Sequence, residues 1–508
     1  MKRFRKVLIA NRGEIAVRVL RALRELEIAS AVIYSEADRD ALPVLMADQA
    51  FPIGPAPAAE SYLRMEAIVD LAVSIGADAI HPGYGFLSER AEFSALCRER
   101  GVVFVGPSPE AIGGMGSKVA ARRRMIAAGV PVVPGSDGPL DDFDAARACA
   151  ERIGFPVMLK ASAGGGGKGM RVVRAAAELA EAYRLARAEA GASFGDDAVF
   201  LERFVERPRH VEIQVLGDLH GKVVSLGERE CSLQRRHQKV VEESPSTVVG
   251  PELRRRMGEA AVAAASAVGY SNAGTCEFLL DAEGRFYFLE MNTRIQVEHP
   301  VTEMVTGLDL VVAQLRVAQG EPLGPEFEGV EPRGHAIEVR LYAEDPFRKF
   351  APSPGRILWL RLPQGPGVRC DAGVYGGSEI SIYYDPMIAK LIVWGRDRVE
   401  ALRRLGRALE ELRVEGIRTN VPLFEALLAD ADFRAGRFDI HWLDRKLGAG
   451  ELAPVERAGL PDLPILAAAI AHYERAQSVA AVGGGAAGSR SRWRTAARRG
   501  GLRSGSWS

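Results

Sequence analysis

The stretch from Cys276 to Glu303 contains the residues whose types and spacing could do chemistry. If the apolar segments CEFLL and RFYFLEMN fold back on the DAEG turn as a β-hairpin, Glu277 faces Glu290. Strand periodicity then places Asn292 on the face of Glu290. Two facing carboxylates destabilise a strand pair unless a cation lies between them, and carboxylate and amide oxygens suit Mg²⁺ or Mn²⁺. The sequence therefore predicts a divalent-metal site formed by Glu277, Glu290 and Asn292.

Three polar residues follow the second strand closely. Arg294 offers a cation, Gln296 an amide, and Glu298 a carboxylate that could act as a base. The alternative interpretation is a solvated hairpin edge with scattered charges. We favour a site, because these polar groups interrupt an otherwise apolar strand, FYFLEMN.

Four consecutive glycines interrupt KASAGGGGKGMRVV, which joins two apolar, β-rich stretches. An interdomain linker is one interpretation of such a run. The short separation of the two stretches favours a hairpin tip, where glycines let backbone N–H groups close on phosphate oxygens. The run is not a Walker A loop, because Gly169 rather than Ser or Thr follows Lys168. We predict a phosphate-binding hairpin, with Lys160 at its base as a positive point charge.

Other polar candidates have two interpretations each. The cationic segment CSLQRRHQKVVEE is either a solvated surface or, beside an acidic metal site, an anion-binding surface. Its candidate residues are Gln234, Arg235, Arg236, His237 and Lys239. His210 alone is more often structural than a ligand contact. Arg340, which strand alternation places on one face with Glu338, is more often an ion-pair partner than a catalytic group.

The elements that must position these residues alternate between helix and strand, which predicts a mixed α/β fold. In residues 1–115 the strand KVLIA leads into a helix with apolar Ile15, Val19, Leu23 and Leu26, and further repeats predict a parallel sheet. HPGYGFLSE follows a strand of that sheet, where ligands usually bind. NRGEIA lacks the G-x-G-x-x-G of a dinucleotide-binding turn.

Three further segments follow this first unit. Residues 116–320 contain the glycine hairpin and antiparallel strands that the Cys276–Asn292 hairpin continues. A Pro/Gly-rich stretch at 320–335 marks a boundary before a third α/β unit, 334–447. Residues 448–508 are predicted to be a linker or a disordered basic tail, with six arginines and no acid between Arg490 and Arg503.

Composition excludes some classes of protein. The 508 residues contain 66 Lys and Arg and 66 Asp and Glu, so bulk charge gives no argument for nucleic acid or a membrane surface. The five cysteines are dispersed and form no CxxC pair, which favours reduced thiols and argues against a zinc ribbon. No apolar run reaches the ~18–20 residues of a membrane span. We therefore expect a cytoplasmic protein.

A glycine hairpin, a basic cluster and a late acidic hairpin, in that order, resemble the ATP-grasp fold. Seven strings in the same order resemble biotin carboxylase from about residue 4 to 447. They are KVLIANRGEIAVRV, HPGYGFLSE, KASAGGGGKGMRVV, ERECSLQRRHQK, FLEMNTRIQVEHPVTE, EVRLYAED and YYDPMIAKLIVWG. The resemblance implies an N-terminal Rossmann-like domain, a mobile glycine-rich lid at about 133–205 and a C-terminal biotin carboxylase domain. It also implies an ATP-dependent ligase that forms a C–N bond.

The resemblance also implies roles for individual residues. ATP would be bound by Lys118, Lys160, Gly166, Gly167, His210, Gln234 and His237, by Glu277 and Glu290, and at its adenine by Glu202, Arg203, Phe204 and Val205. Mg²⁺ or Mn²⁺ would be held by Glu277, Glu290 and Asn292. Bicarbonate would be bound by Lys239, Arg294, Gln296, the backbone of Val297, and Glu298 as general base. Biotin would meet Arg340, which stabilises its enolate, near Tyr84.

Two small departures from the family pattern fall in the lid. Ala163 stands where another glycine is usual, and Arg203-Phe204-Val205 replaces the commoner Lys-Tyr-Leu type. A larger departure is that the sequence contains no Ala-Met-Lys-Met biotin-attachment site. We therefore expect biotin on a separate biotin carboxyl carrier protein, and separate carboxyltransferase subunits.

The expected reaction is the first half-reaction of an acetyl-CoA or related acyl-CoA carboxylase, in fatty acid biosynthesis, by a homodimer. Two alternatives are another ATP-grasp ligase that uses ATP and bicarbonate, and a catalytically silent carboxylase subunit. The intact set of candidate catalytic residues argues against the silent subunit. The context of Arg340 in EVRLYAED argues against the other ligase.

Overall fold

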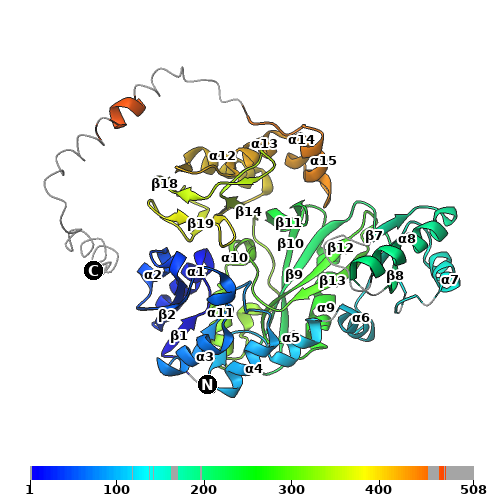
Figure 1. Ribbon diagram of the computed structural model, residues 1–508, viewed down its shortest axis with the longest axis horizontal. Helices are drawn as coiled ribbons and strands as arrows, with labels where there is room; N and C mark the ends of the chain where they lie inside the picture. The colour runs from blue at the N-terminus through cyan, green and yellow to red at the C-terminus, as the bar shows by residue number, and fades with distance from the viewer. Residues whose placement is uncertain are drawn as a thin grey trace.

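The computed structural model describes residues 3–116, 118–136, 138–140, 142–161, 170–194, 197–455, 468–473 and 475. Figure 1 shows an N-terminal unit beside a long central sheet, a C-terminal unit above it, and a small unit that projects to one side. Among the residues just given, no helix has the length and apolar character needed to cross a membrane. Most of the predicted tail, including the arginine-rich stretch 490–503, lies outside the described residues.

The N-terminal unit contains the predicted parallel sheet, with strand order β3-β2-β1-β4-β5. The strands are β1 (Lys6–Ile9), β2 (Ala29–Ser35), β3 (Gln49–Gly54), β4 (Ala79–His81) and β5 (Val103–Phe104). The helices are α1 (Gly13–Glu25), η1 (Glu36–Asp38), α2 (Leu42–Met46), η2 (Ala58–Glu60), α3 (Met65–Ser74), α4 (Ala91–Glu99) and α5 (Pro109–Gly116). HPGYGFLSE begins at the end of β4, as predicted.

Helix α1 forms because its apolar residues recur on one face, and that face packs into the core. Ile15, Val19 and Leu23, spaced four residues apart, are buried. Leu26, which the same periodicity placed in the helix, is its C-cap residue, and its N–H donates to the carbonyl of Ala22. The helix therefore ends one residue earlier than the apolar pattern.

The central sheet has eight strands in the order β13-β12-β9-β10-β11-β14-β21-β19. Its antiparallel strands are β9 (Arg209–Gly217), β10 (Val223–Arg235), β11 (Gln238–Ser244), β12 (Asn272–Leu280), β13 (Phe286–Asn292), β14 (His335–Tyr342), β19 (Val368–Ala372) and β21 (Met387–Gly395). The Pro/Gly-rich stretch at 320–335 does not interrupt this sheet, because β11 pairs with β14 from Val241↔Val339 to Ser244↔Ala336. One sheet therefore continues across that stretch.

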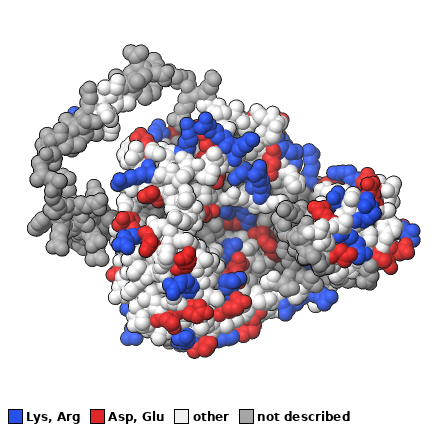
Figure 2. Space-filling model, in the orientation of Figure 1, with Lys and Arg blue, Asp and Glu red and all other residues white. Residues whose placement is uncertain are grey.

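Helices and short strands complete the body. The helices are α6 (Lys118–Ala127), α9 (Pro251–Ser266), α10 (His299–Thr306), α11 (Leu310–Ala318), η3 (Pro325–Phe327), α12 (Arg398–Glu411), α13 (Val421–Ala429), α14 (Ala431–Arg434) and α15 (Trp442–Gly448). The short strands are β15 (Glu344–Asp345), β16 (Ala351–Pro352), β17 (Gly355–Arg356), β18 (Trp359–Arg361), β20 (Glu379–Ile380) and β22 (Arg413–Glu415). Figure 2 shows acidic and basic side chains interspersed on the visible face, in keeping with the balanced composition.

The projecting unit has its own core. Strands β6 (Val157–Ala161), β7 (Met170–Val173) and β8 (Val199–Arg203) form a sheet in the order β7-β6-β8, with helices α7 (Phe143–Ile153) and α8 (Ala176–Phe194). Val157, Leu159 and Leu201 are buried within it. Antiparallel β6 and β7 flank the glycine run, so the predicted hairpin is present, although its tip, residues 162–169, lies outside the described residues.

Glu243 on β11 links this strand to β14 and to helix α12. Its carboxylate on β11 accepts hydrogen bonds from Nε and Nη2 of Arg398, at 2.7 and 2.8 Å, and lies 2.8 Å from Nε2 of His335 on β14. Burial alone would raise the pKa of Glu243, but Arg398 and His335 lower it to about 2. The folded state therefore stabilises the ionised form of this carboxylate.

This pKa shift predicts an acid-sensitive contribution to stability. Because the folded pKa of about 2 lies below the ordinary 4.5, the stabilisation is present above pH 4.5 and is lost as the pH falls toward 2. The contribution should be about 3 kcal/mol at neutral pH. Glu243→Gln should lower the free energy of unfolding at pH 7 and flatten its decline below pH 4.5, measured by urea denaturation. Equal pH slopes for the two proteins would contradict the assignment.

Candidate active site

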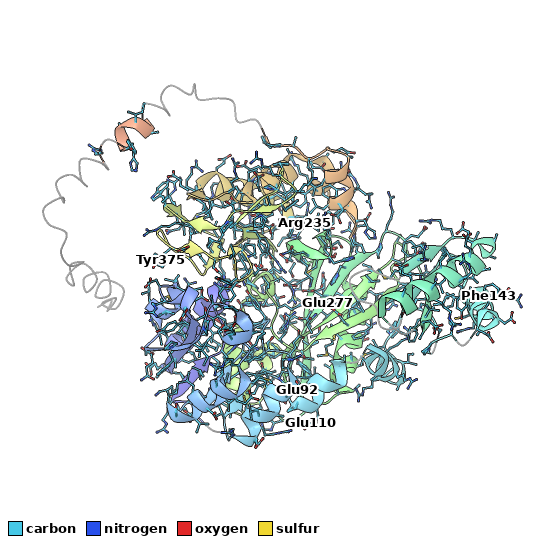
Figure 3. All side chains as sticks on the ribbon, in the orientation of Figure 1. Glu92, Glu110, Phe143, Arg235, Glu277 and Tyr375 are labelled. Atoms are coloured by element: carbon cyan, nitrogen blue, oxygen red, sulfur yellow. The ribbon has the colours of Figure 1, made fainter. Side chains whose placement is uncertain are left out.

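The predicted hairpin forms from β12 and β13, with Glu277 directly opposite Glu290. Phe278, Phe286 and Phe288 pack edge to face, with ring centroids 5.4 and 6.0 Å apart, and anchor the hairpin in the core. The pairing shifts register between Glu277 and Phe278, and such a shift re-aims side chains. Glu277 is buried, whereas Glu290 is exposed. Figure 3 shows Glu277 near the centre of the molecule, beside the projecting unit.

Lys239 on β11 lies among three carboxylates. Its Nζ is 2.5 Å from Oε2 of Glu212, 2.9 Å from Oε1 of Glu277 and 2.6 Å from Oε1 of Glu298. Burial would lower the pKa of Lys239, but these three carboxylates raise it well above its usual value. Lys239 is therefore a fixed ammonium ion. Its side chain is only 12% exposed, so the solvated-surface interpretation is wrong at this residue, and anion binding stays a prediction.

Arg229, which is fully buried, holds the carboxylate cluster around Lys239 in place. Nε of Arg229 donates to Glu212 at 2.5 Å, Nη1 donates to Gln214 and Thr302, and Nη2 donates to Thr275 and, at 2.7 Å, to Oε1 of Gln296. A planar guanidinium presents its donors in fixed directions, so each acceptor is held at a defined position. Arg229 thereby fixes both Glu212 and Gln296.

The residues after β13 turn back over Glu277. Nδ2 of Asn292 and Nε2 of Gln296 both donate to Oε1 of Glu277 at 2.9 Å. Arg294 donates through Nη2 to Oδ1 of Asn292 at 3.0 Å and through Nε to Glu89 at 2.9 Å. Gln296, the predicted amide, therefore contacts Glu277 directly, whereas Arg294, the predicted cation, contacts Asn292, which itself donates to Glu277.

Glu298 lies between two cations. Its Oε1 accepts from Lys239, and its Oε2 accepts from Nη2 of Arg340 at 2.8 Å. Burial would raise the pKa of Glu298, but Lys239, Arg340 and Arg229 hold it well below its usual range. Glu298 is therefore an ionised carboxylate that can accept a proton.

Tyr84 and the backbone of Val297 are joined through a second buried lysine. Nζ of Lys390 donates to the carbonyl of Val297 at 2.7 Å and lies 3.2 Å from Oε1 of Glu14. The hydroxyl of Tyr84 donates to the same Glu14 oxygen. Lys390 and Arg340 are Cα partners on neighbouring strands. The predicted biotin residues are therefore adjacent to the predicted bicarbonate loop.

Two of the predicted phosphate or ribose residues lie near Glu277 and others do not. Nε2 of His210 is 3.0 Å from Oε2 of Glu277, and its Nδ1 is 3.0 Å from Nε2 of Gln234. Burial would lower the pKa of His210, but Glu277 raises it. His237 is instead an exposed residue at the turn between β10 and β11, with φ of 68°.

The predicted nucleotide residues of the projecting unit lie on its sheet. Nζ of Lys160 on β6 lies 2.5 Å from Oε2 of Glu202 on β8. Arg203 ends β8, and its N–H donates to the carbonyl of Pro134, while Phe204 and Val205 follow the strand. Lys118 begins α6, but its side chain lies outside the described residues, as do Gly166 and Gly167.

The donor set Glu277, Glu290 and Asn292 fits a hard divalent cation, because it offers two carboxylates and an amide oxygen. Ligand atoms of a second group, His210, Glu212 and Glu277, lie within 4.8 Å of one another. Nζ of Lys239 lies within 2.9 Å of both carboxylates of that group, so an ammonium ion already supplies the positive charge there. Because Glu277 belongs to both sets, this contact does not separate them, and the metal site at Glu277, Glu290 and Asn292 stays a prediction.

Sequence reasoning missed the residues that hold the others in place. They are Glu14, Glu89, Glu212, Arg229, Glu242 and Lys390. Burial was a usable signal for some, since Lys390 lies in the apolar strand MIAKLIVWG, where a charge demands a partner. Spacing gave no indication of which partner each would find.

Comparison with known proteins places this arrangement in a family. The N-terminal domain of biotin carboxylase matches residues 3–112, the ATP-binding domain of the carbamoyl-phosphate synthase L chain matches 117–326, and the C-terminal domain of biotin carboxylase matches 338–445. The chain is 53% identical over 447 residues to a biotin carboxylase of Haemophilus influenzae, covering 88% of this chain and 99% of that one. It belongs to the biotin carboxylase family.

Other members of the biotin carboxylase family differ in the complexes they serve. The chain is 52% identical over 441 residues to one of the subunits of the pyruvate carboxylase of Methanothermobacter thermautotrophicus, covering 87% of this chain and 90% of that one. It also matches the biotin carboxylase domain dimer of Hydrogenobacter thermophilus 2-oxoglutarate carboxylase, solved with MgADP, ADP and bicarbonate. That match has a TM-score of 0.80 and 48% identity, and it covers 89% of this chain and 100% of that one. The predicted ATP-grasp fold and family membership are confirmed.

The environment of Arg229 predicts a large effect of a conservative change. Arg229→Lys removes most of the donors that hold Glu212 and Gln296, and it leaves buried acceptors without partners. The free energy of unfolding should fall by about 3–5 kcal/mol. Arg255→Lys on α9 is the matched control, because Arg255 is exposed and should be replaceable without measurable change. Equal stability of the two variants in chemical denaturation would contradict this role of Arg229.

Proposed function

We propose that this biotin carboxylase family member uses ATP and bicarbonate to carboxylate biotin that is attached to a separate biotin carboxyl carrier protein. The observation that carries the proposal is the position of Glu298, which accepts hydrogen bonds from both Lys239 and Arg340. The proposed base, Glu298, therefore contacts both the cation proposed for bicarbonate, Lys239, and the cation proposed for the biotin enolate, Arg340. Domain organisation is proposed as 1–115, 116–320 with a lid at about 133–205, and 334–447.

The first step is formation of carboxyphosphate. Lys239, Arg294, Gln296 and the backbone of Val297 orient bicarbonate, and Glu298 takes its proton. A bicarbonate oxygen then forms a bond to the γ-phosphorus of ATP as the bond from that phosphorus to the ADP oxygen breaks. Lys118, Lys160, the Gly166 and Gly167 amides, His210, Gln234 and His237 hold the nucleotide phosphates or ribose, and Glu202 to Val205 hold the adenine.

Glu277, Glu290 and Asn292 would hold a divalent cation, Mg²⁺ or Mn²⁺, which would neutralise charge on the transferring phosphoryl group. Because carboxyphosphate is labile in water, the glycine hairpin is proposed to close over it as a lid. The local core of the projecting unit supports this proposal, since such a unit can move as one body.

The second step transfers the carboxyl group. Carboxyphosphate breaks down to CO₂ and phosphate, and the phosphate takes the N1′ proton of biotin. Arg340 stabilises the negative charge on the ureido oxygen of the enolate, while N1′ forms a bond to the CO₂ carbon. Tyr84 is proposed to line the biotin pocket, held there by Glu14.

The wider assembly follows from the same proposal. The chain is proposed to act as a homodimer with separate carboxyltransferase subunits, in the cytoplasm, as part of an acetyl-CoA or related acyl-CoA carboxylase in fatty acid biosynthesis. The similarity to the pyruvate carboxylase of Methanothermobacter thermautotrophicus favours pyruvate as a second candidate acceptor. The acceptor is chosen by the carboxyltransferase, so both candidates leave the chemistry above unchanged.

The first test is phosphate release from Mg·ATP with bicarbonate, with and without free biotin. We expect hydrolysis that depends on bicarbonate and is stimulated by biotin. Bicarbonate-dependent hydrolysis indifferent to biotin would instead indicate another ATP-grasp ligase. No hydrolysis by a folded, ATP-binding protein, even with the carrier added, would favour a silent subunit.

Replacement of the base gives a second prediction. Glu298→Gln retains the side-chain size but cannot accept the bicarbonate proton, so bicarbonate-dependent turnover should fall by roughly 10²–10⁴-fold. Glu303→Gln is the matched control, because it is the same substitution five residues further on, in helix α10. Glu303 forms ion pairs with Arg18 and Arg369 rather than with Lys239. ATP binding, measured by calorimetry, should persist in both variants. Turnover near that of the parent protein in Glu298→Gln would exclude this residue as the base.

A further inference from the structure

Arg340 is held by two carboxylates that come from different kinds of structure. Its Nε donates to Oε1 of Glu242 at 2.6 Å, and its Nη2 lies 2.5 Å from the same oxygen and 2.8 Å from Oε2 of Glu298. Glu242 is part of strand β11, next to the strand that carries Arg340, whereas Glu298 lies between β13 and α10. All three side chains are buried.

The two carboxylates have different fates during the proposed reaction, and the inference rests on that proposed function. Glu298 becomes a neutral acid when it takes the bicarbonate proton, and its attraction for Arg340 then weakens. This loss occurs just before Arg340 must be in place for the biotin enolate. Glu242 takes no proton from a substrate in the proposed steps, so its ion pair with Arg340 persists.

A third carboxylate, Glu338, lies directly across from Glu242. The two residues are Cα partners in β11 and β14, and both are 0% exposed. Among the described residues, neither oxygen of Glu338 has a hydrogen-bond partner, nor does Oε2 of Glu242. Two like charges facing each other in a buried strand pair are strongly unfavourable, so one of the pair must carry a proton.

The surroundings decide which carboxyl is protonated. Burial raises the pKa of both groups, to about 7 for Glu242 and well above its usual value for Glu338. Arg340 contacts Glu242 and stabilises its ionised form. Lys390 and Arg340 attract ionised Glu338, but neither donates a hydrogen bond to it, and an ionised carboxylate without a hydrogen bond is costly to bury. The proton therefore resides on Glu338.

We propose that Glu242 is the positioning residue that holds Arg340 in place throughout the reaction, and that Glu338 is its neutral counterpart. Protonated Glu338 adds no second negative charge beside Arg340. The guanidinium then faces one permanent carboxylate, Glu242, and one that the reaction neutralises, Glu298. When Glu298 is protonated, its attraction for Nη2 of Arg340 weakens. The N–H that Nη2 donated to Glu298 can then be donated to the biotin oxygen, while Nε and Nη2 stay close to Glu242.

The test compares Glu242→Gln, Glu242→Asp and Glu338→Gln in the full chain, after the parent protein has shown biotin-stimulated phosphate release. Glu242→Gln should lower kcat/KM for free biotin by at least roughly tenfold, equivalent to about 1.4 kcal/mol in the barrier. Its loss of bicarbonate-dependent hydrolysis without biotin should be smaller. Glu242→Asp keeps the charge and should recover part of the loss, and Glu338→Gln should retain biotin kinetics within about twofold of the parent.

Infrared spectroscopy tests the protonation state independently of activity. At neutral pH the parent protein should show a carboxylic acid C=O band that is absent in Glu338→Gln and present in Glu242→Gln. Parent-like biotin kinetics in folded Glu242→Gln, or an unchanged acid band in Glu338→Gln, would overturn the inference. Absence of biotin-stimulated activity in the parent would instead overturn the proposed function, while the infrared result would still decide the protonation state.

Discussion

The structure depends on the ammonium group of Lys239, which lies within hydrogen-bond distance of Glu212, Glu277 and Glu298. Three carboxylates this close to one another would repel strongly in a buried site without a cation among them. Lys239 removes that repulsion, and Arg229 below it fixes the carboxylate of Glu212. The hairpin of β12 and β13 and the loop from Arg294 to Glu298 are therefore positioned by one charge balance, so that the candidate site is already assembled in the folded chain.

Much of the fold could be predicted from local patterns. The hairpin of Glu277 and Glu290 was predictable because a turn and two apolar segments set its register, and helix α1 was predictable from the spacing of Ile15, Val19 and Leu23. Continuity of the central sheet across residues 320–335 could not be predicted. The pairing of β11 with β14 joins segments more than ninety residues apart, and such pairing has no local signal in the sequence. Composition indicated a boundary at residues 320–335, but backbone hydrogen bonds between β11 and β14 join the segments on either side of it.

The candidate site shows the same division. Residues that would touch substrates, such as Glu298 and Arg340, occur in recognisable strings, and the structure brings them within 2.8 Å of each other. Residues that hold them, such as Arg229 and Glu242, look like ordinary strand charges in the sequence, because their importance arises only from partners on other strands. His237 shows a limit of assigning roles by resemblance. It lies exposed at the turn between β10 and β11, apart from the cluster of buried charges around Lys239.

The shared central sheet also bears on how such chains can diverge. Strands β11 and β14 pair through their backbones and carry the facing residues Glu242 and Glu338. The units on either side of residues 320–335 therefore share one sheet and are not separately folded domains in contact. A recombination event at that stretch would bring together strands whose buried charges had not evolved to match. The projecting unit, with a core of its own, is free of this constraint. Viable chimeras between relatives should accordingly have their junctions at the base of the projecting unit, and the body should be inherited as a whole.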